Sequence, residues 1–391
     1  MTVVHEYESR EMSLTRNQAL GLQQTGFVEV APSSGDRWKV TATAYVGSLV
    51  VDGFKLLVRP KINPENLFLL LEPGLPPKAW RQEAFDYDAS SDLLPAVVSF
   101  FARTVETTLR RGVLRSYEPR EESLVALRGR LNTSSLFNQA GLLTPVPCSY
   151  DDFSEDVFEN RVLKAAIRLA LKVPRLASAV RQRLMRQIIA LELVSDVIVR
   201  PENVDSIHFS RLNEHYKPAL GLARLLLANL TLTDGHGTNN ASSFMVNMND
   251  LFQRFVTERL RIALRGHLSV VDEPTVHLGL AKQVPMQPDL EFRNLSNQLS
   301  YVGDIKYKIS NDARGRSSDY YQLLAYTTAM DLPEGVLIYC RRKGSKEQRT
   351  VTVRNNSKRL VLRSVDLTGS SQEVDHAMQE TAEAIVIAAR R

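Results

Sequence analysis

The sequence has few cysteines, few aromatic residues and no long apolar run. Its only cysteines are Cys148, which we place in a proline-rich loop, and Cys340; two are too few for a disulfide framework or a cysteine metal cage. The longest apolar stretches, such as Leu67–Leu71, fall far short of the ~20 residues that a membrane-spanning helix needs. The N-terminus does not read as a signal or transit peptide. We therefore expect a cytoplasmic protein without membrane association.

Two nucleotide-binding motifs are also absent. The chain has neither a G-x-x-x-x-G-K-[ST] loop nor a G-x-G-x-x-G fingerprint. We expect that this chain binds no nucleotide by those routes, so that any energy it uses comes from a partner. A formal net charge of +5 permits nucleic-acid binding without demonstrating it.

The composition is that of a globular protein of two or three domains, with 43% hydrophobic and 24% charged residues over a length of 391. Residues 1–78 are β-rich, and the Asp52-Gly53 pair between two apolar runs predicts a tight hairpin turn. Residues 79–240 show helical periodicity, with helices expected at Leu93–Leu109, Ala177–Val194 and Tyr216–Leu230. Residues 241–391 are expected to form an α/β domain. The fold class predicted is multidomain α+β.

The last domain alternates helices and strands. The apolar stripe predicts a helix over Met248–Leu264, followed by short strands and a helix over Asp319–Ala329. Strands are expected at Val276–Leu280, Pro288–Phe292, Leu299–Lys306 and Gly335–Cys340. The last of these is nearly all apolar, which is typical of a strand covered on both faces.

Two carboxylates and an amine are expected to meet at the edge of this sheet. Asp304 and Lys306 point to one face of their strand, and a hairpin-like turn can bring Asp289 beside them. Two such carboxylates suit Mg²⁺, with Mn²⁺ as a substitute, and the carbonyl of Ile305 is a further expected ligand. The cation would activate a water for phosphodiester hydrolysis, and Lys306 would orient or deprotonate that water. Asp-x-Lys alone is expected about once by chance in such a chain, so the flanking strands and helices carry the prediction.

Polar and basic side chains gather near this site. Gln322 and Tyr326 lie four apart on the following helix and can reach the site from one face, although an ordinary helix surface has the same spacing. Lys308, Arg314 and Arg316 are candidate DNA-phosphate contacts, which would make binding salt-dependent. A solvated run of charges explains the same residues without DNA.

Asp289, Asp304 and Lys306 in this order of elements resemble the PD-(D/E)xK nuclease family. The wider chain resembles McrC, the nuclease subunit of the methylcytosine-specific McrBC restriction systems. The resemblance rests on short stretches in a constant order, namely Tyr45–Gly47, Arg59–Ile62, Leu127–Leu131, Cys148–Phe153, Asn160-Arg161, Phe209–Asn213, Met248–Phe252, Asp304–Lys308, Tyr321-Gln322 and Ala325-Tyr326.

This resemblance implies an endonuclease subunit that cuts double-stranded, methylated DNA only with a hexameric McrB-like AAA+ GTPase. It also implies that the N-terminal β domain reaches the motor and stimulates GTP hydrolysis. Within that domain, Arg59 and Lys61 are the expected partner-binding residues.

One position departs from the family pattern. The helix beginning near Met248 would carry a metal-side glutamate after Phe252, where this chain has Gln253, and Glu258 is rotated by about 140° from that position. This departure favours a second hypothesis, a non-cutting adaptor that grips DNA and activates the motor. A third is an autonomous repair or RNA-processing nuclease of the same fold.

Overall fold

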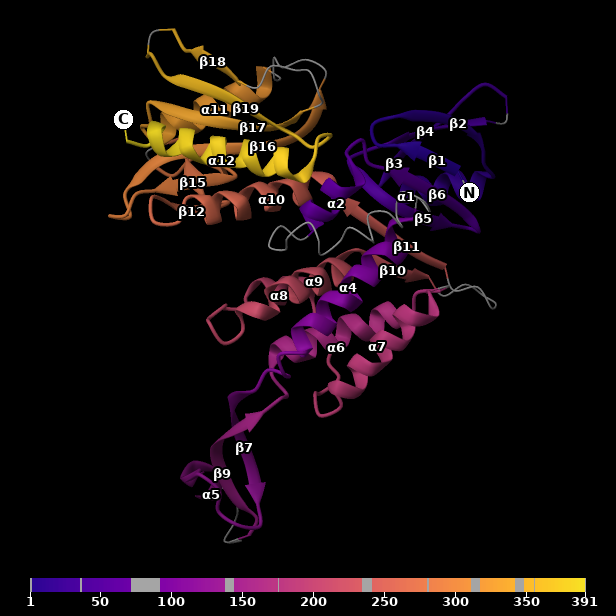
Figure 1. The fold of residues 1–391 in the computed structure, drawn as a ribbon, viewed down its shortest axis with the longest axis vertical. Helices are drawn as coiled ribbons and strands as arrows, with labels where there is room; N and C mark the ends of the chain where they lie inside the picture. Colours follow the sequence, from indigo (N-terminus) through magenta and orange to yellow (C-terminus); the bar gives the residue numbers. More distant parts are fainter. Residues whose placement is uncertain are drawn as a thin grey trace. The chain divides into compact units, whose positions relative to one another are not determined.

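The computed structural model describes residues 2–35, 37–71, 92–137, 144–174, 176–233, 241–279, 281–310, 317–341, 348–354 and 356–390 (Figure 1). Contacts divide the chain into two units, Met1–Ala96 with Ser243–Arg391, and Val97–Ser242. Both helices and several sheets are present, which confirms a multidomain α+β protein. The three-part division at residues 78 and 240 stays a prediction. Among the described helices, none combines the length and apolar character needed to cross a bilayer.

The N-terminal part of the first unit is β-rich, as the sequence predicts. Its elements are β1 (Thr2–His5), β2 (Ser9–Ser13), α1 (Arg16–Gln24), β3 (Val28–Pro32), β4 (Arg37–Ala42), β5 (Tyr45–Val51), β6 (Phe54–Arg59) and α2 (Pro64–Leu71). One antiparallel sheet has the order β2-β4-β3. In a second sheet, β1 runs parallel to β6, and β5 pairs with β6 and with β11 (Ala241–Asn247).

Two glycines are required by this second sheet. Asp52 and Gly53 both have positive φ, 46° and 74°, between the paired residues Val51 and Phe54, which confirms the predicted hairpin turn. Gly47 has a φ of 137°, and a Cβ there would lie 2.0 Å from the carbonyl oxygen of Phe244. A side chain at this position would push β5 and β11 apart.

The C-terminal part of the first unit is a six-stranded mixed sheet in the order β12-β15-β16-β17-β19-β18 (Figure 1). Strands β16, β17 and β19 are parallel, and the remaining pairings are antiparallel. The strands are β12 (Ser269–Asp272), β15 (Leu290–Arg293), β16 (Leu299–Ser310), β17 (Glu334–Arg341), β18 (Gln348–Thr352) and β19 (Arg359–Asp366), with a separate pair β13 (Val276–His277) and β14 (Pro285–Met286).

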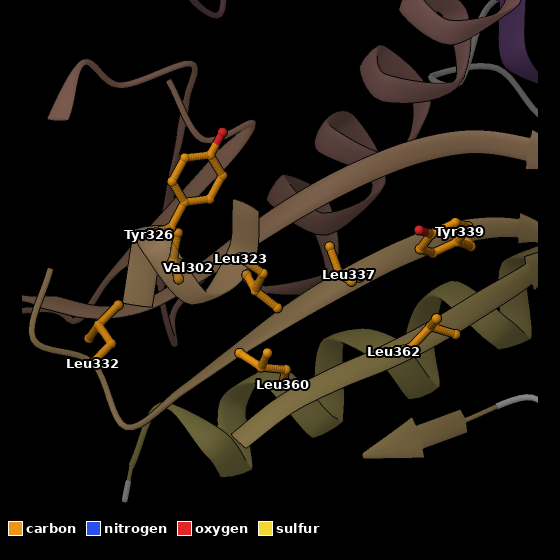
Figure 2. Packing of buried hydrophobic residues seen from close by; sticks show 8 residues of the cluster. All are labelled: Val302, Leu323, Tyr326, Leu332, Leu337, Tyr339, Leu360 and Leu362. Atoms are coloured by element: carbon orange, nitrogen blue, oxygen red, sulfur yellow. The ribbon is translucent and has the colours of Figure 1, made fainter. Parts of the chain in front are cut away.

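Helices cover both faces of this sheet. They are α10 (Met248–Ala263), α11 (Ser317–Ala329) and α12 (Ser371–Ala388). Val302 of β16 belongs to an apolar cluster with Leu323 and Tyr326 of α11 (Figure 2). Tyr307 lies five residues further along β16 and so faces the other side, where its ring packs at a tilt against Phe252 of α10, with 5.8 Å between ring centroids. Therefore α11 and α10 lie on opposite faces.

The second unit consists of helices and a three-stranded antiparallel sheet in the order β7-β9-β8. Its elements are α4 (Leu93–Leu109, which begins in the first unit), β7 (Ser116–Leu124), β8 (Arg130–Leu131), α5 (Thr133–Phe137), β9 (Val146–Ser154), α6 (Phe158–Leu171), α7 (Ser178–Ala190), α8 (Pro201–Asp205), η2 (Glu214–Tyr216), α9 (Lys217–Asn229) and β10 (Leu230–Thr233). The three helices predicted here are confirmed. The antiparallel pair β7 and β9 was not predicted, and it places Cys148 in a strand instead of a loop.

A buried carboxyl joins the N-terminal strands to the C-terminal sheet. Glu6 follows β1 and is fully buried. Its Oε1 accepts hydrogen bonds from the backbone N–H of Lys61, at 2.6 Å, and from the hydroxyl of Tyr307, at 2.9 Å. Its Oε2 is buried without a hydrogen-bond partner among the described residues. Burial raises the pKa of Glu6 from 4.5 to about 7.

This raised pKa makes the stability of the protein depend on pH. Between pH 4.5 and 7 the folded chain keeps a proton that the unfolded chain has lost, so stability falls as the pH rises through this window. We expect Glu6→Gln to remove this part of the fall, as shown by melting temperatures measured from pH 5 to 8. Glu29→Gln, at an exposed position on β3, is the matched control. Identical pH profiles for wild type and Glu6→Gln would contradict the prediction.

Candidate active site

Three of the predicted site residues lie together on two adjacent strands. Leu290 of β15 pairs with Gly303 of β16, so the preceding Asp289 lies opposite Asp304. A carboxylate oxygen of Asp289 accepts a hydrogen bond of 2.6 Å from the backbone N–H of Ile305. The Lys306 ammonium lies 2.8 Å from Oδ2 of Asp304. The antiparallel pairing thus brings side chains far apart in sequence to one edge of the sheet.

Burial and repulsion together oppose ionisation of the two carboxyls. Asp304 is fully buried, and burial followed by repulsion from Asp289 raises its pKa from 3.8 to about 7. Burial also raises the pKa of Asp289, although the N–H of Ile305 and the charge of Lys306 act in the opposite direction. Burial lowers the pKa of Lys306, but its attraction to Asp304 and Asp289 outweighs this and raises the pKa overall. The amine is therefore protonated at neutral pH.

The residues fit a hard divalent cation. Oδ1 of Asp304 is buried and has no hydrogen-bond donor in the described part of the chain, and a cation would satisfy it. No group of three or more His, Cys, Asp or Glu side chains within the described residues is close enough to hold a metal together. A cation here would depend on the two aspartates, on water and on backbone oxygen. The role of the Ile305 carbonyl stays a prediction.

The two predicted residues of α11 bond to each other and reach the loop before β15. The Gln322 amide donates to the Tyr326 hydroxyl at 2.6 Å, and this hydroxyl donates to the backbone carbonyl of Gln287 at 3.1 Å. In Figure 2 the hydroxyl of Tyr326 points away from the apolar cluster that holds its ring. Burial, then the negative charges of Asp304 and Asp289, raise the pKa of Tyr326. This hydroxyl is therefore a hydrogen-bond donor at the edge of the site.

Glu273, which directly follows β12, is a residue of the site region that was not predicted. Its backbone N–H donates to the carbonyl of Asp289 at 3.1 Å, and its carboxylate accepts a hydrogen bond of 3.0 Å from the amide of Gln253. Glu258 instead pairs with Arg261 on its own helix, at 2.9 Å. Nothing in the local sequence marks Glu273, because its position depends on how β12 pairs with β15.

The remaining predicted residues are placed only in part. Lys308 lies in β16, while Arg314 and Arg316 fall outside the described residues. Arg59 is half-buried at the end of β6, opposite His5 of β1. Lys61 is half-buried too, with its ammonium 3.8 Å from Glu8. The DNA-binding and partner-binding roles stay predictions.

The mixed sheet, with helices on both faces and an Asp–Asp–Lys cluster at its edge, defines an α/β domain within a multidomain α+β protein. The sequence model of the McrBC 5-methylcytosine restriction system component matches residues 40–340, well over half of the chain. The chain belongs to this family, and the predicted McrC-type identity is confirmed.

Two relatives show how far the likeness extends. The chain is 23% identical over 309 residues to the Type IV methyl-directed restriction enzyme EcoKMcrBC of Escherichia coli K12, covering 72% of this chain and 86% of that protein. It also resembles a chain of the Thermococcus gammatolerans assembly of McrB AAA+ hexamers with bound McrC. The TM-score is 0.55 and the identity 19%, over 98% of this chain and 100% of that one. The second likeness shows a common fold.

The raised pKa of Asp304 makes the stability of the metal-free protein depend on pH. Because this pKa is raised from 3.8 to about 7, ionising the folded, metal-free site costs free energy that grows as the pH rises through this window. We expect Asp304→Asn to gain melting temperature relative to wild type between pH 5 and 8 in a chelator, by on the order of a few degrees. Asp331→Asn, at an exposed position, should show no such trend. A variant no more stable than wild type at pH 8 would contradict the prediction.

Proposed function

We propose that this chain is the DNA-cleaving subunit of a McrBC-type restriction system, hydrolysing phosphodiester bonds at a Mg²⁺ site held by Asp289 and Asp304. The observation that carries the proposal is a fully buried Asp304, opposite Asp289, with an oxygen that no donor satisfies within the described residues. Such a buried carboxylate pair is costly unless a cation or a function requires it.

Each residue of the site has a distinct proposed part in the reaction. A bound cation would supply charge neutralisation and a more acidic water. Lys306, whose ammonium is protonated and one-fifth exposed, orients the attacking water and stabilises charge that grows on the phosphate. Tyr326, whose hydroxyl accepts from Gln322 and donates to the Gln287 carbonyl, holds the segment before Asp289 in place at the opposite edge of the site.

The proposed partners are a hexameric McrB-like AAA+ GTPase and methylated double-stranded DNA. Two observations support the first: the family assignment and the absence of a phosphate-binding loop from the sequence. The N-terminal β strands are the proposed contact with the motor, and Lys308, Arg314 and Arg316 are proposed to contact DNA phosphates.

A second candidate function is a non-cutting adaptor that activates the motor. The observation that favours it is Gln253, a neutral amide beside the site, together with the lack of a three-carboxylate cluster among the described residues. Fewer charged ligands mean weaker binding of a divalent cation.

Cleavage and motor activation can be separated by changes at the site. We expect Lys306→Ala and Asp304→Asn each to lower cleavage of methylated DNA at least about a hundredfold, measured with motor, GTP and Mg²⁺. GTPase stimulation should persist, because these side chains lie in the C-terminal sheet. Lys172→Ala, an exposed lysine in the second unit, is the control. Normal cutting by Asp304→Asn would rule out the site, and no cutting by wild type with intact GTPase stimulation would favour the adaptor.

Changes at the proposed partner-binding residues should have the opposite pattern, with an effect on the motor and none on the cation site. We expect Arg59→Ala and Lys61→Ala to weaken GTPase stimulation several-fold while leaving Mn²⁺ binding by the isolated chain unchanged. Titrating the variant into a fixed amount of motor measures the first, and calorimetry the second. If both variants stimulate the motor as wild type does, the N-terminal strands contact it elsewhere or not at all.

A further inference from the structure

Strand register places a third carboxylate in line with the two aspartates. Asp272 of β12 pairs with Leu290, and Leu290 pairs with Gly303. One residue beyond these paired positions lie Glu273 after β12, Asp289 before β15 and Asp304 in β16. Continuing the same register places the three side by side in a row across neighbouring strands. The hydrogen bond from the Glu273 N–H to the Asp289 carbonyl shows that this row continues past the last printed pair.

The backbone of Glu273 adopts a conformation that glutamate seldom takes. Its φ is +48°, in the left-handed region, which residues other than glycine seldom adopt. Three hydrogen bonds hold it there: the N–H to Asp289, the carbonyl to the amide of Gln287 at 3.3 Å, and the carboxylate to Gln253. These contacts hold Glu273 through its backbone on both sides and through its carboxylate.

The same contacts connect Glu273 to the other edge of the site. Gln287 donates its amide to Glu273 and accepts the Tyr326 hydroxyl on its carbonyl. Asp289 lies two residues after Gln287 in the sequence, and its backbone carbonyl accepts from the N–H of Glu273. A continuous chain of hydrogen bonds therefore runs around Asp289 from Gln322 to Gln253.

The charge of Glu273 is available to a cation. Its side chain is exposed and has no cationic partner within 4 Å among the described residues. The adjacent Asp272, by contrast, is paired with Arg261. Two aspartates offset by one lysine leave a net charge of only about −1 at the site, a weak attraction for a divalent ion. A further carboxylate at the rim would roughly double that charge.

We propose that Glu273 is the third carboxylate of the cation site and acts through the water shell of the cation. The assignment rests on the proposed function, because it needs the site of Asp289 and Asp304. Outer-shell binding follows because the described carboxylates do not form a group of three in direct reach of one ion, and because Mg²⁺ keeps several of its waters in protein sites. Gln253 is then a positioning residue, which directs the carboxylate of Glu273.

The test is Mn²⁺ binding by the full chain without motor or DNA, measured by titration calorimetry and by the electron-paramagnetic-resonance signal of free Mn²⁺. We expect Glu273→Gln to weaken binding about tenfold, as removal of an outer-shell partner does elsewhere. Asp272→Asn, which removes the same charge one residue away, is the matched control and should change binding less than about twofold. Gln253→Ala should give a smaller loss than Glu273→Gln, and no further loss when combined with it.

The outcomes separate this inference from the proposed function. If Asp304→Asn abolishes Mn²⁺ binding while Glu273→Gln binds as wild type does, the assignment of Glu273 is wrong and the aspartate site stands. If Asp272→Asn weakens binding as much as Glu273→Gln, the effect is only long-range charge, and the assignment is again wrong. If wild type binds no Mn²⁺, or Asp304→Asn binds it normally, the cation site itself is wrong.

Discussion

The interaction on which the candidate site depends is the repulsion between two carboxyls that the sheet forces together. The pairing of β15 with β16 sets Asp289 opposite Asp304, and apolar strands and α11 exclude water from them. The protein offsets this cost only in part, through one backbone N–H and the Lys306 ammonium. A divalent cation would offset the rest of this electrostatic cost. The geometry that destabilises the protein without metal therefore also favours binding of a cation.

Much of the fold could be predicted where one physical signal dominates locally. The apolar stripe of α4 gives the helix Leu93–Leu109 with both ends correct, and Asp52-Gly53 gives its turn, because few other residues accept positive φ at two successive positions. Strands β7 and β9 were not predicted, because they are polar along most of their length and have no alternating apolar face. These strands are held by pairing with each other and, for β9, with β8, and such pairing cannot be read from a local stretch of sequence.

The residues of the candidate site, too, could be predicted only where the local sequence marks them. That Asp289, Asp304 and Lys306 would meet followed from strand alternation and a short connection, and the structure places them together. Glu273 could not be found, since its place depends on the register of β12 against β15 and on an unusual backbone angle. Gln253 looked like the loss of a charge. In the structure its amide, on helix α10, donates a hydrogen bond to the carboxylate of Glu273, which follows β12.

Strand β16 carries site residues on one face, and on its other face it contacts the N-terminal part of the same unit. Asp304 and Lys306 face α11, while Tyr307 faces α10 and bonds to Glu6. Lys306 and Tyr307 are consecutive, so the strand cannot shift at one without shifting at the other. Metal and phosphate chemistry tolerates displacements of only about half an ångström. The buried Glu6–Tyr307 hydrogen bond therefore connects the residue that follows β1 to the strand that carries the site, and its geometry bears directly on the neighbour of Lys306.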